Sequence, residues 1–130
     1  MIHTSNVQLS KGSINKRLNW TFTLAQDPIS ISLEFGVRIT VATVVPATPL
    51  VRVDPPFNSK VNVTWVSGQI TLIIFNVTTA DEGVYSCEMT SANAKKWRRN
   101  IKVEVVGNYK VIVLCCSFTV TVMHGGRLIC

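Results

Sequence analysis

The sequence predicts an all-β protein, built as an antiparallel sandwich of two sheets. Valine, isoleucine and threonine are abundant, and such β-branched side chains favour extended backbone over helix. Eight or nine short segments alternate apolar with polar residues, and turn residues separate them. No window carries a sustained apolar stripe at helical spacing. Many short strands joined by turns indicate a sandwich.

The first half of the chain contains four such segments. An edge strand with a glycine turn is expected at 7–13. In the next segment Leu18, Trp20 and Phe22 alternate with polar residues, which predicts a half-buried strand up to Leu24. Two further strands are expected at 29–35 and 38–45. Prolines in 46–49 and 54–56 interrupt the pattern, because proline lacks the donor that a ladder requires.

The second half contains four more. Val61, Val63 and Trp65 point one way on the next strand, and Ser67-Gly68 turns into a strand at 69–77 whose inward residues include Leu72. Strands at 84–89 and 101–105 follow, with a polar loop between them. We therefore predict one domain at 1–106 and a tail of different character at 107–130.

The run Asp81-Glu82-Gly83-Val84-Tyr85-Ser86-Cys87, placed after a strand, resembles the E–F corner of an immunoglobulin domain of the variable type. The resemblance implies a Greek-key sandwich with a tyrosine corner at Asp81, Gly83 and Tyr85, in which the tyrosine hydroxyl returns to upstream backbone. It also implies an ion pair across the end of the sandwich, for which Lys60 and Asp81 have the right interval. Two unrelated surface charges are the alternative.

The sequence departs from that family at its most typical contact. An ordinary immunoglobulin domain pairs a strand B cysteine with the strand F cysteine and packs a strand C tryptophan on the bridge. Here no cysteine precedes Cys87. We expect Trp20, or Phe22 in a shifted register, to fill that volume, with Leu33 or Phe35 in the place of the tryptophan. Cys87 would then be a buried thiol, and a bridge from it to the tail cysteines is the alternative.

The tail has three interpretations. Val111 to Met123 is an apolar run shorter than the ~20 residues that span a bilayer, and it contains Cys115-Cys116. It could be a clipped membrane anchor, an extra strand on the sandwich, or intron read-through, and we prefer the third. Met1 to Ser10 has no apolar stretch long enough for a signal peptide, so we expect a mature fragment, an expressed fragment or an incomplete gene model. The resemblance implies that the parent protein is anchored in a membrane.

Glycosylation signals indicate an extracellular location. Asn19, Asn62 and Asn76 each begin an Asn-x-Thr acceptor motif. Strand alternation places these asparagines on the solvent side.

An enzyme is not expected, and neither is a cofactor. No phosphate-binding glycine loop and no Gly-x-Ser-x-Gly elbow occurs, and the seven acidic residues form no acid/base pair. His3 and His124 lie far apart without partners at metal-ligand spacing, so we expect no metal site. The net charge of +6 is moderate, and one short basic run does not favour nucleic-acid binding.

That basic run is the candidate binding loop: Lys95, Lys96, Trp97, Arg98 and Arg99. Four cations around an indole could bind an anionic glycan or an acidic protein patch. The alternative is that Trp97 caps the sandwich and the cations blunt an edge strand.

The resemblance implies a recognition module of a cell-surface receptor or adhesion molecule. Such domains bind a protein ligand, or an identical receptor on another cell, through the sheet of strands G, F, C and C′ or through end loops. That sheet is expected to present Ile31, Leu33, Phe35, Val37 and Ile39, together with the segment from Met89 to Trp97. A glycan-binding module and a structural spacer are the competing hypotheses.

Overall fold

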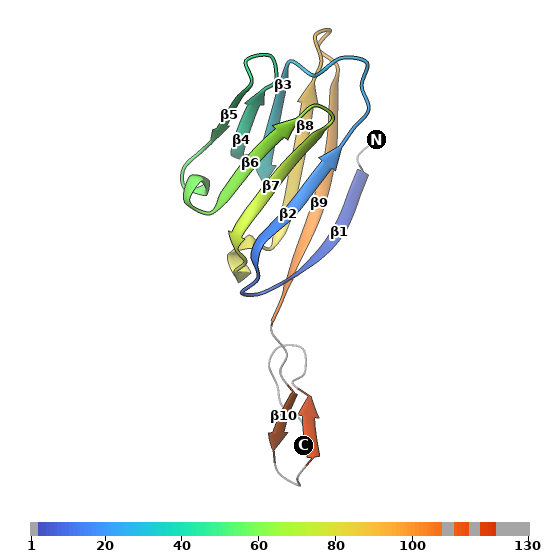
Figure 1. Ribbon diagram of the computed structural model, residues 1–130. Helices are drawn as coiled ribbons and strands as arrows, with labels where there is room; N and C mark the ends of the chain where they lie inside the picture. The colour runs from blue at the N-terminus through green and yellow to red at the C-terminus, as the bar shows by residue number, and fades with distance from the viewer. Residues whose placement is uncertain (1–2, 108–110, 115–117, 122–130) are drawn as a thin grey trace.

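The computed structural model describes residues 3–107, 111–114 and 118–121, and it confirms the predicted β-sandwich (Figure 1). The nine strands of the sandwich are β1 (His3–Ser10), β2 (Ile14–Thr21), β3 (Ser30–Phe35), β4 (Ile39–Val45), β5 (Leu50–Val53), β6 (Val61–Val66), β7 (Gln69–Asn76), β8 (Gly83–Thr90) and β9 (Lys96–Val106). Two short 3-10 turns, η1 (Phe57–Ser59) and η2 (Thr79–Asp81), lie among them. The strands β10 (Val111–Leu114) and β11 (Phe118–Thr121) pair with each other in a separate antiparallel sheet.

The two layers of the sandwich differ in size. Six strands form one sheet in the order β1-β9-β8-β3-β4-β5, and three form the other in the order β2-β7-β6. The three-stranded sheet lies in front in Figure 1, and the six-stranded sheet lies behind it. All pairs in the sandwich are antiparallel except β1 with β9, which is parallel along all eight residues of β1.

Several predicted boundaries were wrong. β1 begins at His3 rather than at Val7, and β2 ends at Thr21 rather than at Leu24. Past that point the chain bends away, although Phe22 N–H still donates to the Gly68 carbonyl at 3.0 Å. β9 begins at Lys96, well before the predicted 101–105, and β5 was not predicted at all. Its four residues lie between two proline-containing turns and are held by pairing with β4.

The core lies between the two sheets and takes one face of each strand. Leu18 and Trp20 of β2, Leu33 of β3, Leu72 of β7 and Cys87 of β8 are all buried in it. Phe22 lies only half-buried and stacks on Trp65, with ring centroids 5.7 Å apart. Trp20 therefore takes the core position, and the alternative register for Phe22 was wrong.

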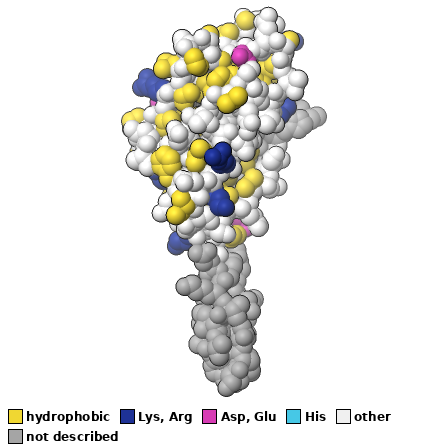
Figure 2. All heavy atoms as spheres, in the orientation of Figure 1, with side chains coloured by type: hydrophobic (Ala, Val, Ile, Leu, Met, Phe, Trp, Pro, Cys, Tyr) yellow, Lys and Arg dark blue, Asp and Glu magenta, His cyan; other side chains and the backbone are white. Residues whose placement is uncertain are grey.

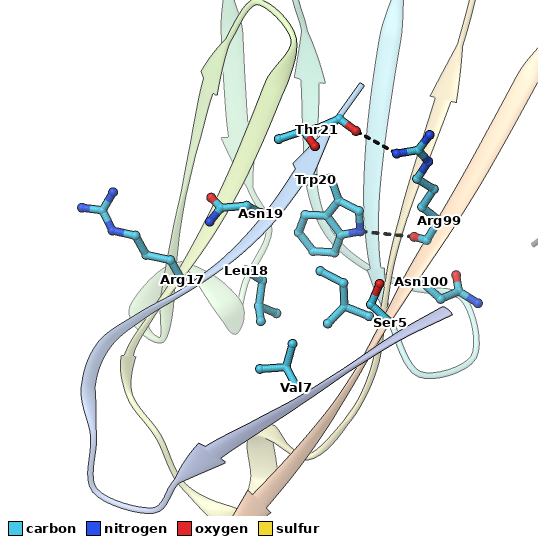
Figure 3. Close-up of a pocket in the computed structure, with 10 residues that line it drawn as sticks. Ser5, Val7, Arg17, Leu18, Asn19, Trp20, Thr21, Arg99 and Asn100 are labelled. Atoms are coloured by element: carbon cyan, nitrogen blue, oxygen red, sulfur yellow. Dashed lines mark hydrogen bonds between the residues drawn. The ribbon is translucent and has the colours of Figure 1, made fainter. Parts of the chain in front are cut away.

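A bond between the sheets forms where an immunoglobulin disulfide would lie. The indole N–H of Trp20 on β2 donates to the backbone carbonyl of Arg99 on β9 at 3.2 Å. The Arg99 guanidinium in turn donates to the Thr21 carbonyl at 2.8 Å, so β2 and β9 are tied twice (Figure 3). Arg99 pairs in register with Cys87, whose thiol is free and buried, and this burial raises the pKa of Cys87 to about 12. The cysteines of the tail lie outside the described residues.

The corner that carries the family resemblance is closed by buried contacts. The Tyr85 hydroxyl donates to the backbone carbonyl of Asp81 at 2.8 Å, and the Asp81 carboxylate accepts from Thr78 N–H at 2.7 Å. Lys60 Nζ lies 3.8 Å from the same carboxylate. Burial, and then the Asp81 charge, raise the pKa of Tyr85 far above its ordinary value, so its hydroxyl remains a donor. Gly83, which lies between Asp81 and Tyr85, has a φ of +150°, a backbone conformation that residues with a side chain rarely adopt.

Candidate functional site

The outer face of the six-stranded sheet, here called the six-strand face, is the candidate binding surface. Because successive side chains on a strand point to opposite faces, burial of Ile31 and Leu33 turns Ser32 and Glu34 outward. Ser32 lies opposite Glu88 on β8, and Glu88 lies opposite Arg98 on β9. These three strands therefore bring polar side chains together at the middle of the face.

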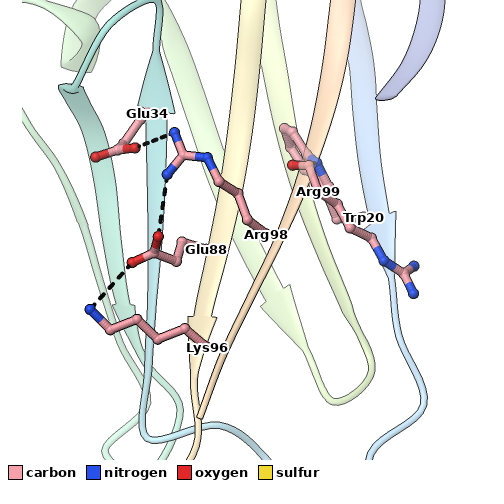
Figure 4. Close-up of polar contacts among 6 residues, drawn as sticks. All are labelled: Trp20, Glu34, Glu88, Lys96, Arg98 and Arg99. Atoms are coloured by element: carbon pink, nitrogen blue, oxygen red, sulfur yellow. Dashed lines mark hydrogen bonds and ion pairs between the residues drawn. The ribbon is translucent and has the colours of Figure 1, made fainter. Parts of the chain in front are cut away.

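Four of these side chains form a connected charge cluster (Figure 4). Arg98 donates through Nη2 to Glu34 Oε1 at 2.8 Å and through Nη1 to Glu88 Oε2 at 3.2 Å. Lys96 Nζ lies 3.8 Å from the other oxygen of Glu88. The planar guanidinium suits two carboxylates at once, and the partial burial of the cluster weakens screening by water. Two acids and two bases give the charge cluster no net charge and a fixed pattern of alternating sign.

A hollow of about 590 Å³ extends from the charge cluster to the turn between β3 and β4. Gly36, Val37 and Arg38 line it together with the cluster itself. Val37 is 88% exposed, and Ile39 just beyond it is 52% exposed. The six-strand face thus combines a polar centre with an apolar margin.

The predicted composition of this face was partly wrong. Ile31 and Leu33 are fully buried in the core, so they cannot contact a partner. Phe35 packs against the core with Tyr85, at a ring-centroid distance of 4.7 Å. Of the five residues named from the sequence on β3, on β4 and in the turn between them, Val37 and Ile39 are the exposed ones. Glu34 and Glu88 were not predicted as residues of this face, although strand alternation alone turns Glu34 away from Leu33.

The basic run was expected in the loop before the last strand of the sandwich and in the start of that strand, and most of it lies in the strand. Lys96 to Arg99 belong to β9, so their side chains alternate between its two sides. Lys96 and Arg98 join the charge cluster, whereas Arg99 reaches across to β2. Lys95 stays in the loop before β9, where it lines a hollow of about 430 Å³ beside Trp97, Asp27 and Leu24. Trp97 is 38% exposed at this end of the sandwich.

All three glycosylation motifs lie on the other sheet. Asn19 on β2, Asn62 on β6 and Asn76 at the end of β7 are exposed. Asn19 Oδ1 accepts from Thr71 Oγ1 at 2.7 Å and from Gln69 Nε2 at 3.1 Å. These contacts use the side-chain oxygen, so they leave the amide nitrogen, which would carry a glycan, available. In Figure 2, which views the molecule from this side, uncharged and apolar atoms dominate the surface.

The described residues contain no group of three or more histidine, cysteine, aspartate or glutamate side chains that could hold a metal ion. No helix in the same part of the chain is long and apolar enough to cross a bilayer. The side chain of His3 and all of His124 lie outside what the structure describes.

Comparison with solved structures identifies the fold. The first Ig-like domain of human CD48 matches with a TM-score of 0.71, over 86% of this chain and 89% of that domain, at 18% sequence identity. The chain has the fold of a variable-type immunoglobulin domain. Murine CEACAM1b matches with a TM-score of 0.63 over 80% of this chain and 52% of its own, at 18% identity.

A third solved structure has the same fold. The extracellular domain of the voltage-gated sodium channel β4 subunit, described as a parallel homodimer with a role in cell–cell adhesion, has a TM-score of 0.58 at 13% identity. That match covers 81% of this chain and 92% of the sodium channel domain. No protein-family model matches the sequence, and no curated protein matches it significantly. The likeness to these solved structures, at 13–18% identity, shows the fold of this domain.

Proposed function

We propose that this immunoglobulin domain is an extracellular recognition module of a membrane-anchored protein and binds another protein through the six-strand face. The placement of the glycosylation motifs carries the proposal. Glycans at Asn19, Asn62 and Asn76 would shield the outer face of the β2-β7-β6 sheet. The six-strand face has no such motif on its strands, so it stays accessible to a partner.

The charge cluster supports a partner of matching pattern, and an identical domain is the simplest one. In a two-fold interface the same patch faces itself, so each acid of one copy can meet a base of the other. A face with equal numbers of acids and bases can do this without net repulsion. The sodium channel β4 subunit, a structural neighbour, is itself described as a homodimer in cell–cell adhesion.

The test is sedimentation velocity over a wide concentration range, with two variants that make the same charge change. Lys96→Glu places a third carboxylate in the charge cluster, whereas Lys16→Glu changes an exposed lysine on β2 of the other sheet. We expect reversible association that Lys96→Glu weakens and Lys16→Glu does not. Equal weakening by both variants would refute a role for the six-strand face.

A strict monomer would exclude self-recognition and leave a heterophilic protein ligand, to be sought by binding of the labelled domain to cells. Lys96→Glu should then reduce cell binding relative to Lys16→Glu. If neither variant changes it, the module does not bind through this face, and a spacer role becomes the better hypothesis.

Glycan binding through the basic run is the weaker candidate. Three of its four cations already contact protein oxygens, since Lys96 and Arg98 face carboxylates and Arg99 donates to the Thr21 carbonyl. Salt-sensitive retention on heparin that disappears when Lys95, Lys96, Arg98 and Arg99 are all neutralised would favour this candidate instead.

A further inference from the structure

One edge of the three-stranded sheet is open in the part of the chain that the structure describes. β2 pairs with β7 on one side, and no described strand pairs with its other side. The strand β1, which could have covered that edge, follows β9 in the other sheet along its whole length. An uncovered strand edge presents unpaired backbone donors and acceptors, which can pair with an added strand.

The ladder between β2 and β7 shows which backbone groups face the open edge. Phe22 N–H donates to the Gly68 carbonyl, at the next step of that ladder beyond Trp20 and Ile70. Because hydrogen-bonded residues alternate along an antiparallel pair, Leu18 and Trp20 bond toward β7. Arg17, Asn19 and Thr21 therefore direct their N–H and carbonyl groups outward. The Arg99 guanidinium confirms this direction, since it reaches the Thr21 carbonyl from that side.

A groove runs beside this edge between the two sheets (Figure 3). It has a volume of about 580 Å³ and is lined by Ser5 and Val7 of β1, residues 17–21 of β2, and residues 99–101 of β9. Leu18, Trp20 and Ile101 lie buried at its floor, and Val7 is partly buried beside them, among polar groups. The inward side chains of an added strand would lie against this interior, because alternate residues of a strand share one face.

The charges beside the groove indicate that the partner segment is acidic. No aspartate or glutamate lines it, whereas Arg99 of β9 lines it and Arg17 of β2 borders it, next to Lys16. Figure 3 shows Arg17 directed away from the groove, on the outer side of the sheet. A second copy of β2 would bring like charges together, so self-pairing is opposed. Acidic residues at the outward positions of an added strand would lie beside Arg17.

We propose that the open edge of β2 binds an extended segment of another protein by strand addition, with apolar residues facing the groove and acidic residues facing outward. This surface is distinct from the six-strand face, but it borders the glycosylation motif at Asn19, so binding is measured on the unglycosylated chain.

The probe is a fluorescent seven-residue peptide, TVEVEVT, titrated into the full chain and followed by anisotropy. The comparison peptide TVKVKVT reverses the charges, and a version of the first peptide with alternate N-methylated amides removes half of its backbone donors. We expect binding of the acidic peptide that weakens about tenfold or more in both comparison peptides, a factor that corresponds to ~1.4 kcal/mol. Equal binding of the acidic and basic peptides, or no saturable binding at about 1 mM, would overturn the proposal.

Amide exchange locates the contact. Peptide binding should newly protect the N–H groups of Arg17 and Asn19, while those of Leu18 and Trp20 are already protected by β7. New protection confined to the six-strand face would contradict strand addition at β2.

Two variants at one position separate the edge from the fold. Asn19→Pro removes an N–H that the β2–β7 ladder does not use and blocks the edge, whereas Asn19→Gln removes the same glycosylation motif and keeps the N–H. We expect loss of peptide binding in Asn19→Pro alone, and equal binding by both variants would overturn the proposal. If Asn19→Pro does not fold, Arg17→Glu serves instead and should reverse the preference toward the basic peptide. Lys96→Glu should leave peptide binding unchanged.

Discussion

Replacing Trp20 with phenylalanine tests whether a hydrogen bond between the sheets stabilises this domain in place of the family's disulfide. Trp20 is buried, and its indole N–H donates to the Arg99 carbonyl across the sandwich at 3.2 Å. Phenylalanine keeps an aromatic ring but leaves that carbonyl oxygen without its donor, at a cost of about 1–3 kcal/mol. The smaller ring also leaves a cavity, which adds roughly 1 kcal/mol. We therefore expect a loss of about 2–4 kcal/mol in the free energy of unfolding.

The matched control is Trp65→Phe. Trp65 is half-buried and stacks on Phe22, and its ring makes no hydrogen bond in the described structure. Phenylalanine can keep the stacking, so this variant should lose less than about 1 kcal/mol. Urea unfolding of both variants, followed by far-ultraviolet circular dichroism under reducing conditions, gives the comparison. Equal losses in the two variants would show that Trp20 acts through ring packing alone.

Three further predictions concern the corner and the core. Tyr85→Phe removes a buried hydroxyl that donates to the Asp81 carbonyl at 2.8 Å, and we expect urea unfolding to show a loss of about 1–2 kcal/mol. Gly83→Ala would place a Cβ 2.9 Å from the Phe35 ring at a strained φ, so thermal unfolding should show a loss of ~1–3 kcal/mol. Burial raises the pKa of Cys87 from 9.0 to about 12, so its alkylation in the folded protein, mapped by peptide mass, should stay slow up to about pH 10. The unfolded state ionises this thiol first, so its contribution to stability falls as pH rises from 9.0 to about 12.

Most strands of this domain could be predicted because each has one buried face and therefore alternates apolar with polar residues. The exception, β5, has four residues between proline turns and depends on its pairing with β4, which the local sequence does not encode. The parallel pairing of β1 with β9 was equally hidden, since an N-terminal strand of this kind could join either sheet. That choice determines whether the edge of β2 is covered.

The candidate site could be predicted only in part. Glu34 and Arg98 are 64 residues apart, and their contact depends on the registers of β3 with β8 and of β8 with β9. Register cannot be read from a single sequence, so the charge cluster was not predicted. The burial of Leu33 was different, because alternation already placed it in the core. Assigning it to the binding face as well was an error of interpretation.

The absence of the usual disulfide connects the two proposed surfaces to the stability of the fold. β2 is held to the other sheet by core packing and by two hydrogen bonds at its end, from Trp20 and from Arg99. A strand added along β2 would compete with Arg99 for the Thr21 carbonyl but would not reach the indole bond, which lies inside the core. The added strand would supply backbone hydrogen bonds at Arg17 and Asn19, on the side of β2 where no described strand pairs. Binding at this edge should therefore stabilise the sheet that lacks a covalent link, while the six-strand face, on the opposite layer, remains unchanged for its own partner.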